Sequence, residues 1–267
     1  MYKRKNHYII GDVHGEYKTL LALIKKLPKD AKLFFVGDLV DRGEHSREVI
    51  AYIRANNHRT VMGNHEALFS KFALEFLSYL DGEIAYEKVN QRWHKSGRFE
   101  TFLSYGLVDI STDAKFTIVN DSNKKEILRD DIEWMRRNPM YIELDATHAS
   151  AKQVVVSHSN ITKVWNIRNN KKMRFEFIET TLWTREQDIE EEADIFNIFG
   201  HSPINYHIGE VYANIDSGCC YASIDNKRYG RLTAYCVETG EVITQNKIGT
   251  KDEKFQRKSK KALQAIL

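Results

Sequence analysis

The sequence predicts an α/β fold in which two mixed β-sheets pack as a sandwich flanked by helices. Two observations support this expectation. Short apolar runs alternate with amphipathic segments of helical spacing through the first third of the chain, and further apolar runs that end in polar residues follow in the last third. The alternation predicts a sheet covered by helices, and the later strands require a second sheet. With 42% hydrophobic residues, 267 residues suffice for one large domain.

Three strands organise the first 80 residues, and each ends in a glycine followed by polar side chains. The first strand, 8–10, precedes Gly11-Asp12-Val13-His14-Gly15 and a helix over 16–27; the second, 32–36, precedes the loop 37–43 and a helix over 48–55; the third, 59–62, precedes Gly63-Asn64-His65-Glu66 and a helix over 67–80. In α/β folds, binding sites gather at the carboxyl ends of strands. We therefore expect the three loops to meet in one crevice.

The rest of the chain supplies two more strand ends and a motif-free middle. Strands over 154–156 and 198–199 precede His158 and His201, and the segments 231–237 and 242–245 predict a β-hairpin that closes the second sheet. We expect one catalytic domain over residues 1–250, in which 81–150 form an inserted or cap region with a helix over 126–137. The basic tail over 251–267 is expected either to dock on this body as a helix or to contact a partner.

Composition and charge narrow the class of protein. The net charge of +3 is too balanced to favour nucleic acid or an anionic membrane as a partner. The three cysteines have neither a disulfide nor a zinc-ribbon pattern, and every apolar run falls short of the ~18 residues of a membrane span. These features predict a cytoplasmic protein with reduced cysteines and no membrane contact.

The strand ends carry a set of metal-binding side chains. Oxygen and nitrogen donors, with no thiolate, come from Asp12, His14, Asp38, Asn64, His158 and His201. Such a set suits two divalent ions, manganese first and iron or zinc as alternatives, because calcium and magnesium sites seldom use histidines. Any one motif alone is equally explained by a turn, and a turn explains Asp216 without chemistry. The repetition over several strands favours the metal site.

Next to these donors lie residues suited to acid catalysis and to phosphate binding. His65 follows Asn64 and is the predicted general acid, and Asp41 is available to orient its imidazole and raise its pKa. Arg42 offers a planar guanidinium to two phosphate oxygens. The six remaining histidines have no motif around them and are predicted to be structural.

The blocks GDVHG, GDLVDRG and GNHE, followed by His158 and His201 in order, resemble the calcineurin-like metallophosphoesterases of the serine/threonine protein phosphatase type, in their compact bacterial or phage form. The resemblance covers about residues 7–220 and implies α/β/β/α layering. It also implies that Asp12, His14 and Asp38 hold one ion, and that Asp38, Asn64, His158 and His201 hold the other. Arg185, in Leu182-Trp183-Thr184-Arg185, matches the second phosphate-binding arginine of the family; a surface ion pair is the alternative. Asn160 and Ser202 depart from the usual pattern without removing a ligand.

We therefore expect a phosphoester hydrolase that uses a hydroxide bridging two metal ions. Its first expected substrate class is phosphorylated protein, with phosphoserine or phosphothreonine and possible dual specificity for phosphotyrosine. The alternative is a diadenosine polyphosphate, whose base would need an aromatic wall; Trp93, Tyr86 and Phe99 are candidates for it. A catalytically inactive binding protein is a third alternative, against which the intact ligand set argues.

Overall fold

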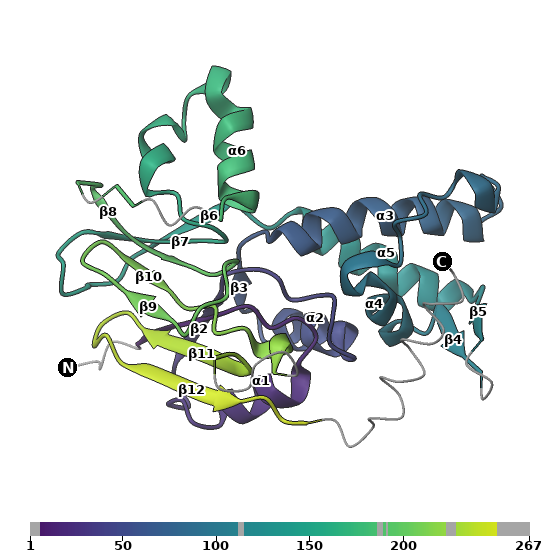
Figure 1. The fold of residues 1–267 in the computed structure, drawn as a ribbon, viewed down its shortest axis with the longest axis horizontal. Coiled ribbons are helices and arrows are strands. Elements are labelled where there is room, and N and C mark those ends of the chain that lie inside the picture. The colour runs from purple at the N-terminus through teal and green to yellow at the C-terminus, as the bar shows by residue number, and fades with distance from the viewer. Residues whose placement is uncertain (1–5, 112–114, 186–188, 191, 223–227, 250–267) are drawn as a thin grey trace.

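The computed structural model contains two five-stranded sheets and a two-stranded hairpin (Figure 1). It describes the chain except residues 1–5, 112–114, 186–188, 191, 223–227 and 250–267. The predicted basic tail, 251–267, therefore lies outside the described residues. Among the described helices, none has the length and apolar character needed to cross a membrane.

The first sheet has the strand order β12-β11-β1-β2-β3. Its strands are β1 (His7–Ile10), β2 (Lys32–Phe35), β3 (Arg59–Thr60), β11 (Arg231–Cys236) and β12 (Val242–Asn246). β1, β2 and β3 are parallel, whereas β11 runs antiparallel to both β1 and β12. The prediction that the β11–β12 hairpin closes the second sheet is wrong. β1 is apolar on both faces and lies inside the sheet, so it pairs on both edges, and the hairpin supplies its second neighbour.

The second sheet has the strand order β6-β7-β8-β10-β9. Its strands are β6 (Tyr141–Leu144), β7 (Gln153–Ser157), β8 (Ile195–Phe199), β9 (His207–Ile208) and β10 (Tyr212–Asn214). β7, β8 and β10 are parallel, and the two edge strands run antiparallel to their neighbours. The motif-free range 81–150 thus ends in an edge strand of this sheet.

The two sheets pack face to face, and alternating side chains separate their layers. Ile9 and Phe34 from the first sheet meet Val154 and Val156 from the second in one buried cluster. Val155 points to the opposite face, where it packs beneath α6 (Arg174–Trp183). The outer face of the first sheet is covered by α1 (Tyr17–Ile24) and α2 (Ser46–Ala55). This layering confirms the predicted α/β/β/α sandwich.

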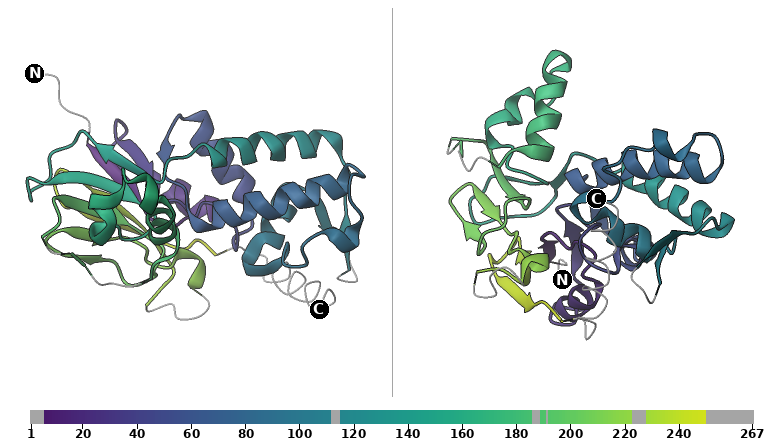
Figure 2. Two further views of the ribbon diagram at one scale, coloured as in Figure 1. Left: turned by 90° about the horizontal axis from the view of Figure 1, so that it is seen from above. Right: turned by 45° about the vertical axis from the view of Figure 1, so that its right-hand side comes forward.

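A helical lobe extends to one side of the sandwich (Figures 1 and 2). It contains α3 (Asn64–Leu80), α4 (Arg98–Ser104), α5 (Ser122–Arg136) and the hairpin of β4 (Val108–Ile110) and β5 (Phe116–Ile118). Its core is aromatic: the ring of Trp93 lies 4.9 Å from that of Phe76, and both Trp93 and Phe99 are fully buried. These two candidates therefore offer no face to a nucleotide base.

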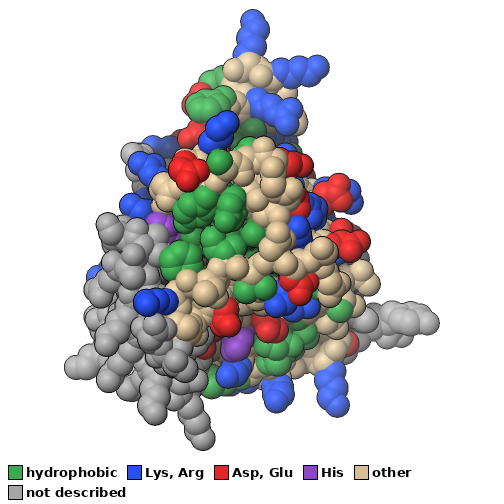
Figure 3. Space-filling model, turned by 90° about the vertical axis from the view of Figure 1, so that its right-hand side faces the viewer, with side chains coloured by type: hydrophobic (Ala, Val, Ile, Leu, Met, Phe, Trp, Pro, Cys, Tyr) green, Lys and Arg blue, Asp and Glu red, His purple; other side chains and the backbone are tan. Residues whose placement is uncertain are grey.

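The surface on the side of the helical lobe mixes charges of both signs. Figure 3 shows acidic and basic side chains interspersed around a hydrophobic area, and Lys and Arg side chains project at the top of this face. No single sign dominates the face shown. This matches the balanced net charge of +3.

Candidate metal and phosphate site

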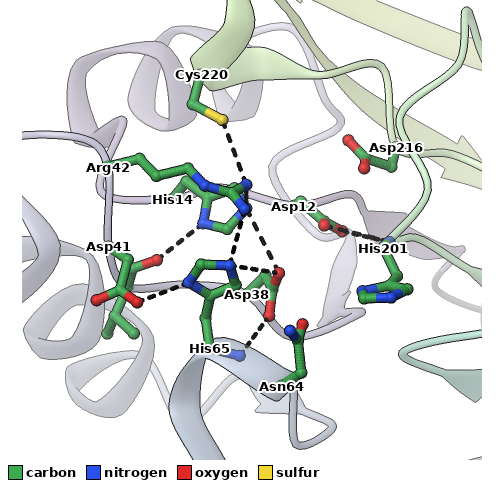
Figure 4. Close-up of polar contacts among 12 residues, drawn as sticks. Asp12, His14, Asp38, Asp41, Arg42, Asn64, His65, His201, Asp216 and Cys220 are labelled. Atoms are coloured by element: carbon green, nitrogen blue, oxygen red, sulfur yellow. Dashed lines mark hydrogen bonds and ion pairs between the residues drawn. The ribbon is translucent and has the colours of Figure 1, made fainter. Parts of the chain in front are cut away.

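Every predicted ligand follows the carboxyl end of a parallel strand. Asp12 and His14 follow β1, Asp38 follows β2, Asn64 follows β3, His158 follows β7 and His201 follows β8. The residues are buried, with exposed fractions from 0% to 5%. The structure thus brings the strand ends of both sheets together at one place (Figure 4).

Asp38 lies at the centre of this arrangement. Its Oδ2 is 3.4 Å from His14 Nε2 and 3.9 Å from His65 Nε2, while its Oδ1 is 3.4 Å from His158 Nε2. Burial opposes ionisation of the carboxyl group, but the three histidines and Arg42 outweigh it and lower the pKa of Asp38. Two groups of possible ligands share this residue: His14, Asp38 and His65 form one, and Asp38, His158 and His201 the other.

Backbone carbonyls fix the tautomers of two of these histidines. His14 Nδ1 lies 2.9 Å from Val40 O, and His158 Nδ1 lies 2.8 Å from Val36 O. Because a carbonyl only accepts, each Nδ1–H must donate, which leaves the lone pair of Nε2 turned toward Asp38. Burial lowers the pKa of both imidazoles and so favours their neutral, ligating form.

Asn64 lies among side chains that offer more hydrogen-bond acceptors than donors. Its Oδ1 lies 2.9 Å from His158 Nε2, and His158 Nε2 is 3.1 Å from His201 Nδ1. If the amide is turned by 180°, its nitrogen faces four acceptors, namely both oxygens of Asp38 and these two imidazole nitrogens, with only two hydrogens to give. A cation would balance either arrangement. The residues therefore fit a divalent ion with oxygen and nitrogen ligands.

Asp12 is not grouped with His14, although the resemblance implies that the two residues hold the same ion. Its two carboxylate oxygens accept from the backbone N–H of His201 at 3.3 and 3.2 Å, and it belongs to neither ligand group. Its approach requires glycine at position 200, since a Cβ there would lie 2.0 Å from Asp12 Oδ1. Burial, Asp216 and Asp38 raise the pKa of Asp12. In this structure His65, not Asp12, completes the group around His14.

His65 and Asp41 form a hydrogen-bonded pair. His65 Nδ1 lies 2.6 Å from Asp41 Oδ2, so Nδ1–H donates to the carboxylate and Nε2 faces the site. Burial alone would lower the pKa of His65, but Asp38 and the hydrogen bond to Asp41 outweigh it and raise the pKa. The structure thus places Asp41 where it orients the His65 imidazole, and the role of His65 as a general acid stays a prediction.

The two predicted phosphate-binding arginines contact different residues of the site. Arg42 Nη1 donates to His14 Nε2 at 2.5 Å, and its Nη2 donates to His65 Nε2 at 2.8 Å. The Arg42 guanidinium also lies over the ring of Tyr221, at 5.0 Å. Arg185 is exposed, and its Nη1 donates to His201 O at 3.3 Å. Both positive charges therefore border the ligand groups.

Glu66 is a structural residue of the site that sequence reasoning missed. One carboxylate oxygen accepts from Asp38 N at 2.8 Å and from Gly63 N at 3.0 Å; the other accepts from Leu39 N at 2.7 Å and from Val40 N at 3.2 Å. Burial and Asp38 raise its pKa to about 7, although the N–H donors act against this. Glu66 thus ties the loop after β2 to the first turn of α3. The available clue in the sequence was the acid three residues after Gly63, a position from which a side chain can accept the N–H group of the N-cap residue.

The site loops are held in an uncommon backbone conformation. Left-handed φ angles occur at His14 (46°), Asp38 (50°), Asp41 (71°), Arg42 (71°) and His201 (66°). Such angles in residues with a Cβ cost about 1–3 kcal/mol each, so the surrounding hydrogen bonds must hold them.

The remaining candidates lie where turn or structural roles explain them. Asp216 Oδ1 accepts from Gly218 N at 2.9 Å, as expected of a turn residue, although its carboxylate is also near enough to raise the pKa of Asp12. Within the described residues, no other histidine joins either ligand group. The structure therefore brings together all the predicted ligands, with Asp12 outside the two groups.

Sequence comparison finds relatives that match part of the chain. Over 165 residues the chain is 30% identical to the symmetrical bis(5'-nucleosyl)-tetraphosphatase of Erwinia tasmaniensis, a match that covers 60% of this chain and 46% of the relative. A protein of the same name from Salmonella paratyphi A is 28% identical over 169 residues, or 61% of this chain and 46% of the relative. The matched region is thus less than half the length of each relative.

Structural comparison finds similar folds at low sequence identity. A crystal structure assigned as a diadenosine tetraphosphatase gives a TM-score of 0.56 at 18% identity, covering 92% of this chain and 95% of the other. A protein serine/threonine phosphatase from Saccharomyces cerevisiae gives 0.55 at 14% identity, covering 93% and 82%. These likenesses concern the fold alone. The model of the calcineurin-like phosphoesterase family matches residues 7–230. The chain therefore belongs to the calcineurin-like phosphoesterase family.

Proposed function

We propose that this protein hydrolyses a phosphoester or phosphoanhydride with the help of two divalent metal ions. The observation that carries the proposal is the position of Asp38, whose two oxygens face separate sets of imidazole nitrogens. His14 and Asp38 would hold one ion, with Asp12 or His65 near it, and Asp38, Asn64, His158 and His201 would hold the other. Bound divalent ions, with manganese the first candidate, would supply a nucleophile at neutral pH and neutralise phosphate charge.

Residues of the chain would perform the remaining steps. Arg42 would exchange its bonds to His14 and His65 for bonds to phosphate oxygens, and Arg185 would approach the phosphate from its position beside His201. His65 would then give its Nε2 proton to the leaving oxygen as the phosphorus–oxygen bond breaks. Asp41 would keep Nδ1 protonated during this transfer, so that only Nε2 exchanges a proton.

A dinucleoside polyphosphate is the substrate that the comparisons favour. The named relatives are tetraphosphatases, so the order expected from the sequence, with phosphorylated protein first, is reversed. Tyr221 also supports a nucleotide, because its half-buried ring lies beside Arg42, where a base next to a bound phosphate could stack. Cleavage would consume one water and give two nucleotide products.

The test compares two substrates in the same assay. Metal-depleted protein is supplied with Mn²⁺ and given diadenosine tetraphosphate or a phosphothreonine peptide, and products are separated by chromatography. We expect metal-dependent cleavage of the dinucleotide, which Asp38→Asn abolishes and the exposed control Asp30→Asn retains. Faster release of phosphate from the peptide would restore the protein phosphatase alternative. Binding without turnover of either substrate would indicate a binding protein.

A further inference from the structure

Helix α4 contacts the His65–Asp41 pair through one buried hydroxyl group. Thr101 is fully buried, and its Oγ1 lies 2.9 Å from both Asp41 N and Asp41 Oδ1. The backbone N–H of Asp41 donates to this oxygen, and the hydroxyl hydrogen is then free to be donated to Oδ1. One hydroxyl therefore holds Asp41 at both its backbone and its side chain.

The two oxygens of the Asp41 carboxylate accept hydrogen bonds from different residues. Oδ1 accepts from Thr101, and Oδ2 accepts from His65 Nδ1 at 2.6 Å. The carboxylate is held at both ends, so its plane and the direction of its bond to the imidazole are fixed. Asp41 also has a φ of 71°, which a residue with a side chain seldom adopts without such support.

The same segment holds the neighbouring arginine by its backbone. Arg42 N donates to Gly97 O at 3.1 Å, at the turn that begins α4. Ser46 Oγ, from α2, lies 3.2 Å from Thr101 Oγ1 and accepts more weakly from Asp41 N, at 3.2 Å. Of these contacts, only the Thr101 hydroxyl bonds the carboxylate itself.

We propose that Thr101 is a positioning residue that sets the orientation of the His65–Asp41 pair for proton donation. This inference rests on the proposed role of His65 as the proton donor. Removing the hydroxyl leaves Asp41 Oδ1 buried without a partner and lets the carboxylate rotate away from Nδ1. Proton transfer to the leaving oxygen then slows, while substrate binding at Arg42 and Arg185 is unchanged.

The test uses leaving groups that differ in their need for a proton. The metal-loaded Thr101→Val protein is compared with wild type on phenyl phosphate, whose leaving oxygen is strongly basic, and on 2,4-dinitrophenyl phosphate, whose leaving oxygen needs little protonation. We expect kcat to fall at least about tenfold on the first ester and less than about twofold on the second, with KM unchanged. Thr101→Ser, which keeps the hydroxyl, should restore the rate.

A matched control is Thr19→Val, in α1. Thr19 is fully buried too, and its hydroxyl accepts a backbone N–H, from Ile248 at 3.0 Å. This variant should lose stability without a dependence on the leaving group. Thr101→Ala is measured in parallel, and circular dichroism checks the fold of each variant, so that a folding defect of the valine variant does not decide the result.

Four results would overturn the inference. An equal loss of kcat on both esters in Thr101→Val would make Thr101 a structural residue only. An unchanged kcat in Thr101→Val would also contradict the inference. So would a dependence of the loss on the leaving group in Thr19→Val. If the wild type cleaves neither the esters nor a dinucleotide, the proposed function fails, and the positioning role fails with it. The wild-type assay separates this last case from the others.

Discussion

Asp38 shows at the scale of one residue how a buried charge is kept in the site. Its carboxylate is almost inaccessible to water, yet three imidazoles, Arg42 and the backbone N–H of His65 face it. Isolated burial would neutralise the group, whereas these neighbours favour its charged form. These neighbouring groups therefore offset the free-energy cost of burying the Asp38 charge.

We expect Asp41→Asn to impair proton donation without harming the fold. An amide can present its NH₂ to His65 Nδ1 and so favour the wrong tautomer, which should lower kcat about 10²-fold to 10³-fold and leave KM unchanged. Steady-state kinetics measure both constants. The double variant Asp41→Asn with His65→Asn should lose no more than His65→Asn alone, because the two residues act as a unit. Additive losses would contradict the pairing.

Glu66→Gln should weaken the loop after β2. One oxygen becomes an NH₂ group that faces two backbone N–H donors, and each unsatisfied buried group costs about 1–3 kcal/mol. We expect a lower free energy of unfolding in urea and a lower affinity for Mn²⁺. Glu48→Gln, at an exposed position of α2, is the control and should change neither quantity.

Sequence reasoning found the side chains that the structure gathers at the strand ends, but it missed the residues that hold these side chains in position. The candidate ligands and the His65–Asp41 pair follow strands in short motifs, so local pattern was sufficient to single them out. Thr101 and Tyr221 contact the loop of Asp41 and Arg42 from distant parts of the chain. No local pattern records such a contact, and nothing distinguished either residue in the sequence.

At the scale of the element, the start of α3 explains a difference from prediction. The helix was expected from residue 67, where apolar periodicity begins, but it starts at Asn64. Gly63 is the N-cap, and the side chain of Glu66 accepts its N–H, which extends the helix through polar residues. Asn64 and His65 therefore lie on a rigid first turn rather than on a loop.

The turn that begins α4 yields a prediction of its own. Gly97 has a φ of +89°, and a Cβ there would lie 2.2 Å from Arg42 N. Gly97→Ala should therefore displace Arg42, raising KM for phosphate substrates and lowering stability by more than the left-handed angle alone. Gly82→Ala is the matched control, since its φ is +78° and nothing lies within 4 Å. It should lose only about 1–2 kcal/mol in urea unfolding and keep full activity.

At the scale of the whole molecule, buried histidines should make the metal-free protein sensitive to acid. Burial lowers the pKa of His14, His58, His94, His148 and His158, and the pKa of His201 falls to about 3. The folded state thus favours neutral imidazole. The stabilisation is present above the unfolded pKa of about 6.5 and is lost as pH falls below it. Urea midpoints measured from pH 8 to pH 5 should decline; a constant midpoint would contradict this.

Metal removal should destabilise the protein beyond its loss of activity. Since the candidate ligands come from five strand ends in two sheets, we expect an ion to bind only the folded chain. Binding at roughly a thousandfold excess over Kd adds about 4 kcal/mol. Thermal unfolding with Mn²⁺ and with a chelator measures the difference in Tm. Asp38→Asn protein should show little change between the two conditions.

The layers of the fold were predictable, whereas the strand partners were not. Alternating strands and helices indicated a sandwich with outer helices, which the structure confirms. The hairpin of β11 and β12 was assigned to the wrong sheet, because a two-residue periodicity identifies a strand but not its neighbour. Partner choice depended on the unpaired edge of β1, far away in the sequence.

That strand order has a consequence for synthesis on the ribosome. Tyr8 pairs with Leu33 on one side and with Cys236 on the other. The nascent chain can pair β1 with β2 early, but the second edge of β1 stays open until the residues of β11 have left the exit tunnel. An apolar strand with an open edge readily pairs with other chains. Until β11 has been synthesised, this edge of β1 is thus open to pairing with other chains, and the first sheet is completed only after every strand of the second sheet has been made.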